Sequence, residues 1–228
     1  MSVDFHREFG GMGLSHPLRS LAVVFFSVSC PVCGAQGAAP CAECARRLRP
    51  APDLATPDGL DGLVAPLSYT GVGRELVARL KYRNARAVLP VVASAIAAMV
   101  DPATVDAVTW APTSAARRRQ RGFDQARLLA RAVARRLHRP CRSLLTRQPG
   151  PPQTGRPKRE RVSGPQFTVT RRPPPRVLVI DDVVTTGATM IAAARALKMS
   201  GVVVVKGAAA ARTPLKARDT LSDAAGDG

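Results

Sequence analysis

The sequence predicts an α/β protein with a mostly parallel sheet that is covered by helices on both faces, preceded by a small metal-binding module. Two observations carry this prediction. Short runs rich in Val and Ile alternate with longer helical patterns over residues 105–206, and such alternation is typical of parallel sheets. Two Cys-x-x-Cys pairs stand ahead of that region, within residues 30–44, at a spacing typical of metal sites.

The length and composition suit a protein with one substantial core. A chain of 228 residues forms one ordinary domain, or one domain and a small module. Apolar residues make up 46% and aromatic residues only 4%, so the core must consist mainly of Val, Leu, Ile and Ala. The first apolar run, residues 21–29, is far shorter than the ~20 residues that span a bilayer. We therefore expect a cytoplasmic protein with no transmembrane segment; the alternative is that this run is a signal-peptide core.

The predicted helices and strands follow from the spacing of apolar residues, and Gly and Pro indicate where these elements end. Leu76, Val77 and Leu80 share one helix face, and Gly201 ends the last helix. The predicted strands are 63–69, 105–110, 166–170, 176–180 and 202–206, and the predicted helices are 45–49, 73–81, 89–100, 123–137 and 189–199. Residues 146–165 are rich in Pro, Gly and basic residues and predict a long exposed loop of the kind that forms lids. The expected domains are a disordered tail at 1–20, a four-cysteine zinc module at 21–50, the main domain at 51–212 and a disordered tail at 213–228.

Cys30, Cys33, Cys41 and Cys44 are the candidate metal ligands. Each Cys-x-x-Cys pair can direct two thiolates at one ion, and four thiolates complete a tetrahedral shell around Zn²⁺ at about 2.3 Å. Gly34 suits the tight turn after the first pair. We expect a structural zinc site, because four cysteines leave no open position for water. Two disulfides, a redox pair and an iron–sulfur cluster are the alternatives.

The stretch Val177–Met190 places two aspartates after an apolar strand, followed by a turn of small residues that leads into a helix. Ligands bind beyond the carboxyl ends of parallel strands, so Asp181 and Asp182 are candidate catalytic residues. Backbone N–H groups at a helix start bind phosphate, and hydroxyls add donors. The candidate phosphate-binding residues are Thr185, Thr186, Gly187, Ala188 and Thr189. The turn would hold a phosphate, and the two carboxylates beside it would accept hydrogen bonds from neighbouring hydroxyls of the ligand. These are the groups of a ribose 5-phosphate. The alternative is that the aspartates and threonines are ordinary helix-capping residues.

This stretch closely resembles the phosphoribosyl pyrophosphate (PRPP) loop of type I phosphoribosyltransferases, and residues 25–212 as a whole resemble the ComF family. ComF proteins carry that fold and are linked to DNA uptake in natural competence. The resemblance also includes both cysteine pairs and the stretches Leu80–Arg83, Trp110–Pro112, Arg121–Gln125, Pro152–Arg161 and Ala210–Arg212. The family usually carries Asn where Asp124 stands in this chain.

The resemblance implies a type I phosphoribosyltransferase-like sheet and a PRPP site that works with Mg²⁺. It implies that Asp181 and Asp182 hold the ribose hydroxyls and that residues 185–189 hold the 5-phosphate. It also implies that Thr113 and Ser114 lie in the loop that faces the pyrophosphate. The acceptor of the phosphoribosyl group is not recognisable in the sequence.

Positive charge gathers in one part of the chain. The 34 basic residues outnumber the 16 acidic ones, and half of the basic residues lie between positions 117 and 172. The candidate anion or nucleic-acid residues are Lys81, Arg117, Arg118, Arg119, Arg121, Arg156, Lys158, Arg159 and Arg161. Three interpretations compete: these residues neutralise the charge of pyrophosphate, they bind the phosphates of a nucleic-acid backbone, or they form a solvated helix face. A general excess of arginine codons is a further explanation of the charge.

Two functional hypotheses follow. The first is a phosphoribosyltransferase that binds PRPP and displaces pyrophosphate. The second is a non-catalytic protein that keeps the PRPP site as a ligand site, binds single-stranded DNA, and acts with the competence machinery at the inner face of the membrane. The charge and the zinc module favour the second hypothesis, and the intact stretch around Asp181 favours the first.

Overall fold

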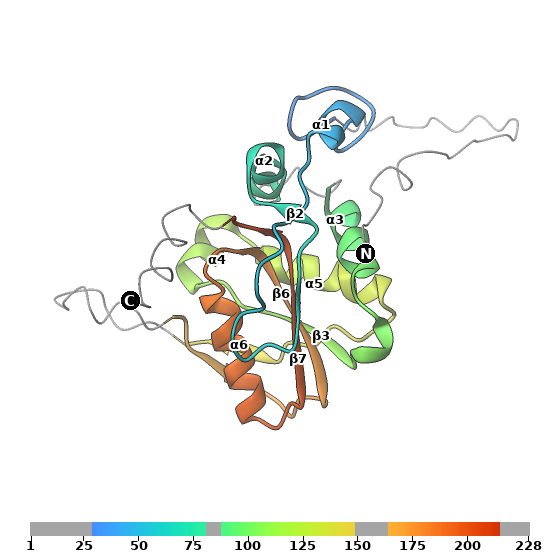
Figure 1. Ribbon diagram of the computed structural model, residues 1–228. Helices are drawn as coiled ribbons and strands as arrows, with labels where there is room; N and C mark the ends of the chain where they lie inside the picture. The colour runs from blue at the N-terminus through green and yellow to red at the C-terminus, as the bar shows by residue number, and fades with distance from the viewer. Residues whose placement is uncertain (1–28, 81–87, 149–163, 215–228) are drawn as a thin grey trace, which may run out of the picture.

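The computed structural model describes residues 29–80, 88–148 and 164–214 (Figure 1). The predicted tail at 1–20 and the part of the predicted C-terminal tail from residue 215 onwards lie outside these ranges. Residues 149–163, which make up most of the predicted exposed loop, also lie outside the described ranges. Within the described chain, no helix is both long enough and apolar enough to cross a membrane.

A parallel sheet forms the centre of the protein, as the sequence predicts. Its order is β1-β7-β6-β3, β2 also pairs with β7, and every one of these pairs is parallel. The strands are β1 (Leu63–Val64), β2 (Leu67–Ser68), β3 (Ala107–Trp110), β6 (Arg176–Val184) and β7 (Val204–Arg212). The α/β class with a mostly parallel sheet is therefore confirmed.

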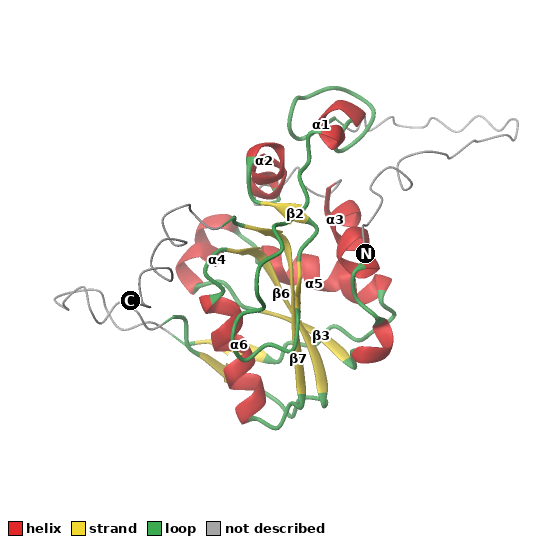
Figure 2. Ribbon diagram, in the orientation of Figure 1, coloured by secondary structure: helices red, strands yellow, loops and turns green. Residues whose placement is uncertain are grey.

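Helices cover both faces of the sheet (Figure 2). Leu178 and Ile180 of β6 point to one face, where they share a core with α2 (Gly71–Arg79), α3 (Val88–Ala98) and α5 (Gln125–Arg136). Val177 and Val179 point to the other face and pack with α6 (Ala188–Met199). Successive side chains of a strand alternate between faces, so the continuous apolar run of β6 supplies both cores at once.

A second, two-stranded sheet lies on the α6 side. Its strands are β4 (Leu145–Arg147) and β5 (Phe167–Val169), which pair in antiparallel fashion. The prediction that the exposed loop begins at residue 146 is therefore wrong at its start. Leu144 and Leu145 are fully buried in the core beneath α6, and this burial holds β4 in an extended conformation.

Several element boundaries differ from the predictions. The predicted strand 63–69 is two short segments, because Pro66 between them has no N–H to donate to a ladder. The first helix is α1 (Ala42–Arg46) and not 45–49, since it begins directly after Cys41. Helix α4 (Ala115–Arg121) was not predicted; its sequence contains four arginines and no apolar period. Strand β7 continues to Arg212 through a run of glycine and alanine that has little strand propensity, because it lies between β1 and β6.

The segment between the cysteines and β1 runs from the carboxyl end of β7, at Arg212, to the amino end of that strand, at Val205. The guanidinium of Arg212 donates to the carbonyl oxygens of Leu54 and Ala55, at 2.8 and 2.5 Å. The carboxylate of Asp61 accepts from the backbone N–H of Val205 at 2.8 Å and from the Lys198 ammonium at 3.1 Å. The predicted turn-rich linker is therefore held against the main sheet along its length.

Candidate functional site

A pocket of about 240 Å³ lies at the carboxyl ends of β3 and β6 and is here called the site pocket. In parallel sheets this is the edge at which ligands bind. The lining residues come from the ends of β3 and β6, the starts of α5 and α6, and the end of β4. They are Ala111, Pro112, Thr113, Asp124, Gln125, Ala126, Arg147, Asp181, Asp182, Val183, Thr185 and Thr189.

Asp181 and Asp182 line the site pocket from within β6 and not from a turn after it. The strand was predicted to end at Ile180, but it pairs with β7 as far as Val184. The Oδ1 atom of Asp181 accepts from the backbone N–H of Asp182 at 2.8 Å, and the Oδ1 atom of Asp182 accepts from that of Val183 at 2.8 Å. Backbone pairing and these two bonds hold both carboxylates in place.

The pKa of Asp181 is raised well above its usual range. Burial is the main cause, because it disfavours the charged form; the negative charge of Asp182 is the next, and that of Asp124 contributes. The hydrogen bond from the Asp182 N–H opposes the shift only in part. The negative charges of Asp182 and Asp124 disfavour the ionisation of Asp181, so the site pocket favours a ligand that brings protons, hydroxyl donors or a cation.

The predicted phosphate turn lies beside these carboxylates. Gly187 caps the start of α6 with φ of 78°, a left-handed conformation that suits glycine. Thr185 and Thr189 line the site pocket, and Thr186, whose Oγ1 accepts from the Ala188 N–H at 3.4 Å, lies at the exposed start of α6. The N-terminal end of a twelve-residue helix thus opens next to the pocket.

Pro57 packs directly against Gly187, in the turn at residues 185–189. A Cβ atom on Gly187 would lie 2.8 Å from the Cγ of Pro57, closer than carbon atoms approach without a shift. Glycine is thus required at position 187 both by its backbone angle and by this contact. The segment that follows the cysteine module therefore helps to shape the turn.

Asp124 is a pocket residue that was not predicted as a site residue. It is 8% exposed; its Oδ2 accepts from the Thr113 N–H at 3.1 Å, and its Oδ1 accepts from the Arg127 N–H at 3.4 Å. It is the N-cap of α5, which explains why that helix begins at Gln125 and not at the predicted Phe123. An aspartate directly ahead of an amphipathic helix is a sequence signal for such a cap.

Gln125 and Arg147 also line the site pocket and were not predicted. Gln125 follows the cap of α5. Arg147 ends β4, in a part of the sequence that gives no strand signal, so its place in the site depends on the fold. Of the predicted pyrophosphate-facing pair, Thr113 lines the pocket, whereas Ser114 lies at the start of α4, where its carbonyl accepts from the Arg118 N–H at 2.9 Å.

The predicted anion residues are only partly described. Arg117, Arg118, Arg119 and Arg121 all belong to α4, which follows the loop after β3; Arg118 and Arg119 are exposed. Arg118 and Arg119 do not line the site pocket, and the side chains of Arg117 and Arg121 lie outside the described part of the structure. Lys81, Arg156, Lys158, Arg159 and Arg161 lie outside the described residues.

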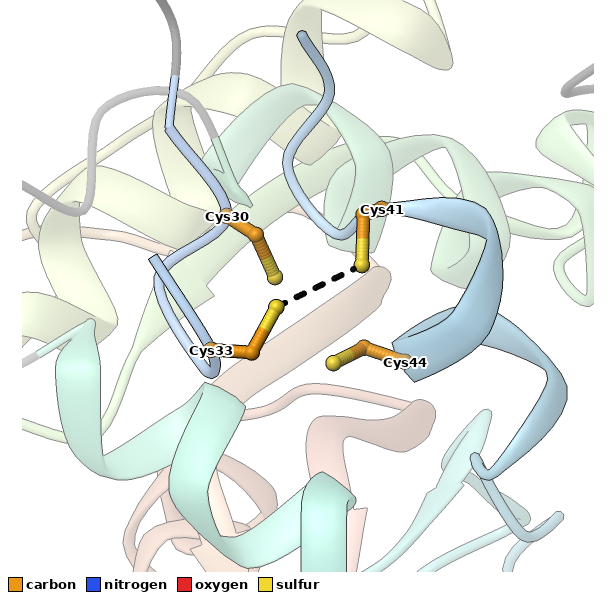
Figure 3. A group of neighbouring side chains, drawn as sticks. All are labelled: Cys30, Cys33, Cys41 and Cys44. Atoms are coloured by element: carbon orange, nitrogen blue, oxygen red, sulfur yellow. Dashed lines mark hydrogen bonds between the residues drawn. The ribbon is translucent and has the colours of Figure 1, made fainter. Parts of the chain in front are cut away.

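The four predicted metal ligands lie together (Figure 3). All four sulfur atoms lie within 4.8 Å of one another, and the Sγ atoms of Cys33 and Cys41 are 3.6 Å apart. A tetrahedron of thiolates at about 2.3 Å from an ion has edges of about 3.8 Å. Both pairs form the same turn, in which the carbonyl of Cys30 accepts from Gly34 at 2.9 Å and that of Cys41 from Ala45 at 2.8 Å.

The pKa values of the two buried cysteines, Cys30 and Cys44, are shifted in opposite directions. Burial acts to raise the pKa of Cys30, but hydrogen bonds from the backbone of Cys41, Cys33 and Val32 outweigh it and lower the pKa to about 6. Burial and the neighbouring sulfurs raise the pKa of Cys44 to about 12. Four adjacent thiolates need a cation between them. The separation of 3.6 Å is far longer than a disulfide bond, and all five cysteines are free.

The comparisons with known proteins give a distant match to a solved structure. No family model and no curated protein matches the chain. One solved structure that matches is a purine phosphoribosyltransferase from Pyrococcus horikoshii OT3, with 16% identity and a TM-score of 0.36 over 57% of this chain and 75% of that one.

Proposed function

We propose that the chain binds PRPP in the site pocket and transfers its phosphoribosyl group to an acceptor. The observation that carries the proposal is the convergence of Asp181, Asp182, Thr185 and Thr189 on one pocket at the start of α6. A helix start and threonine hydroxyls suit a phosphate, and paired carboxylates suit the hydroxyls of a ribose.

In the proposed reaction, the bond between C1 of the ribose and the pyrophosphate oxygen breaks, and both electrons leave with the pyrophosphate. The acceptor bonds to C1 through an oxocarbenium-like transition state and releases a proton. Asp181 and Asp182 hold the ring by accepting from its hydroxyls, and the helix start holds the 5-phosphate. Mg²⁺ bound with PRPP would supply positive charge to the pyrophosphate, and the carboxylate oxygens of the pocket are hard donors that suit it.

Calorimetric titration of PRPP with Mg²⁺ tests the proposal. The variants are the wild type, the double variant Asp181→Asn/Asp182→Asn, and Glu75→Gln, which makes the same carboxylate-to-amide change on the exposed face of α2. We expect binding by the wild type and Glu75→Gln, and an affinity lower by about 100-fold or more in the double variant. Equal binding by all three proteins would contradict the proposed site.

We also propose that the four cysteines hold one structural Zn²⁺. Four sulfur donors within 4.8 Å of one another, with Cys33 and Cys41 at 3.6 Å, suit zinc, and a closed shell of this kind stabilises a small fold. Cys30 and Cys44 pack against Val72 of α2, so the ion would also fix this segment to the main domain.

A second candidate function, binding of single-stranded DNA by a ComF-type competence protein, is favoured by the surface of α5. Arg127, Arg131 and Arg135 are exposed and follow one another at intervals of four residues, which places them on one helix face. A salt titration of single-strand binding tests it: phosphate contacts predict an affinity that falls steeply with salt. A log–log slope near zero would contradict DNA binding, as would an unchanged slope in the triple Arg→Ala variant.

A further inference from the structure

Arg147 stands out among the residues of the site pocket because of its charge. Four of the lining residues carry side chains that are ordinarily charged near neutral pH: the carboxylates Asp124, Asp181 and Asp182, and the guanidinium of Arg147. The exposed arginines of α4 do not line the pocket. Within the described pocket, Arg147 is therefore the residue suited to a second anionic group on the ligand.

The backbone of Arg147 is firmly held. It pairs with Phe167 across the β4–β5 sheet, and the next backbone bond, from Gln148 N–H to the carbonyl of Gln166, is 2.9 Å long. Leu144 and Leu145, just before it, are buried beneath α6. Arg147 as a residue is half-buried, and it lines the pocket from this rigid support. A cation on a fixed strand costs less entropy when it binds an anion than a cation on a free loop.

The topology places Arg147 on the β3 side of the pocket. Residues 141–147 begin with a parallel bridge between Cys141 and Val108, and the Leu144 N–H donates to the Thr109 Oγ1 at 3.4 Å. The segment therefore runs beside β3 in the same direction, towards the loop that contains Thr113. The helix start that suits the 5-phosphate follows β6, the strand that pairs with β3 in the sheet.

We propose that Arg147 binds the pyrophosphate group of PRPP and so distinguishes PRPP from ribose 5-phosphate, an inference that rests on the function proposed above. A guanidinium presents a planar fork of donors that matches two phosphate oxygens, and it keeps its charge at every physiological pH. The same contact would stabilise the charge that develops on pyrophosphate as it leaves.

The test compares two ligands and not one. Dissociation constants for PRPP and for ribose 5-phosphate are measured with Mg²⁺ for the wild type, Arg147→Ala, Arg147→Lys and the control Arg142→Ala. Arg142 lies on the same segment, is exposed, and does not line the pocket. Arg147→Ala should weaken PRPP binding by about 10- to 100-fold and ribose 5-phosphate binding by less than about twofold. Arg147→Lys should lie between wild type and Arg147→Ala for PRPP, and Arg142→Ala should match the wild type.

The outcomes separate this inference from the proposed function. Equal losses for both ligands, or no loss for PRPP, would overturn the assignment of Arg147 while PRPP binding by the wild type stands. A wild type that binds neither ligand would overturn the proposed function, and this inference with it. If Arg147→Ala does not fold, the comparison of the two ligands is made with Arg147→Lys and Arg147→Gln, and the same criterion applies.

Discussion

The Oδ2 atom of Asp124 accepts a hydrogen bond of 3.1 Å from the backbone N–H of Thr113. The other carboxylate oxygen caps α5 through the Arg127 N–H. One buried side chain thus joins the loop after β3 to the start of α5, and it does so at the wall of the site pocket. Arg127 in turn lies over the Trp110 ring, 5.7 Å from its centroid, which ties the same helix turn to β3.

Replacing Asp124 by alanine should remove both bonds and leave the Thr113 N–H without its acceptor. We expect Asp124→Ala to lower the free energy of unfolding by about 1–3 kcal/mol, from the lost cap and the lost loop bond together. Asp124→Asn keeps one acceptor oxygen and should cost less. Urea unfolding measures both variants. A midpoint for Asp124→Ala equal to that of the wild type would show that the loop and the helix do not depend on this carboxylate.

Stability should depend on pH through Asp181. Burial and the charge of Asp182 raise its pKa in the folded state, so the folded chain holds a proton that the unfolded chain has already released. The free energy of unfolding should therefore fall as pH rises from the ordinary aspartate range to the raised value, by at most about 1.4 kcal/mol per pH unit. Asp181→Asn cannot ionise and should not show this fall, whereas Glu75→Gln should behave as the wild type. Identical pH profiles for all three proteins would refute the raised pKa.

The contact between Pro57 and Gly187 should make substitutions at these positions non-additive. Gly187→Ala incurs the cost of a left-handed backbone, about 1–2 kcal/mol, and a clash with a rigid proline ring. Gly201→Ala is the matched control, because Gly201 has φ of 90° and no heavy atom within 4 Å of its added Cβ. We expect Gly187→Ala to be the more destabilising in urea unfolding, and Pro57→Gly to remove that excess. An unchanged excess in the Pro57→Gly background would mean that the clash is relieved elsewhere.

The cysteine cluster should bind one zinc ion per chain. Native mass spectrometry should detect one Zn²⁺ in the wild type and none in Cys33→Ser, while Cys141→Ser, outside the cluster, should retain it. Acidification should release the metal, because protons compete for the thiolates. A wild-type mass that is lower by four hydrogens, with no metal, would instead mean two disulfides.

The main features of the fold were predictable from local sequence. The alternation of strands and helices predicts a parallel sheet, because each pattern is set by which side chains an element must bury. The two Cys-x-x-Cys pairs predict a cluster of four sulfurs, since the spacing alone determines the turns that bring each pair together. The place of Asp181 and Asp182 at the ligand-binding edge follows from the strand that precedes them.

Other features depend on contacts between distant segments, which no local pattern contains. Strand β7 forms from a run of glycine and alanine because β1 and β6 offer hydrogen-bonding partners on both sides, and β6 continues past Asp182 for the same reason. Arg147 reaches the site because β4 pairs with β5 across twenty residues of chain. Asp124 gains its second partner, Thr113, because α5 packs beside β3. The sequence alone determined the class of fold, the cluster of four cysteines, and the pair of aspartates ahead of a threonine-rich turn. The tertiary structure decided which side chains complete the pocket, since those positions are set by long-range packing.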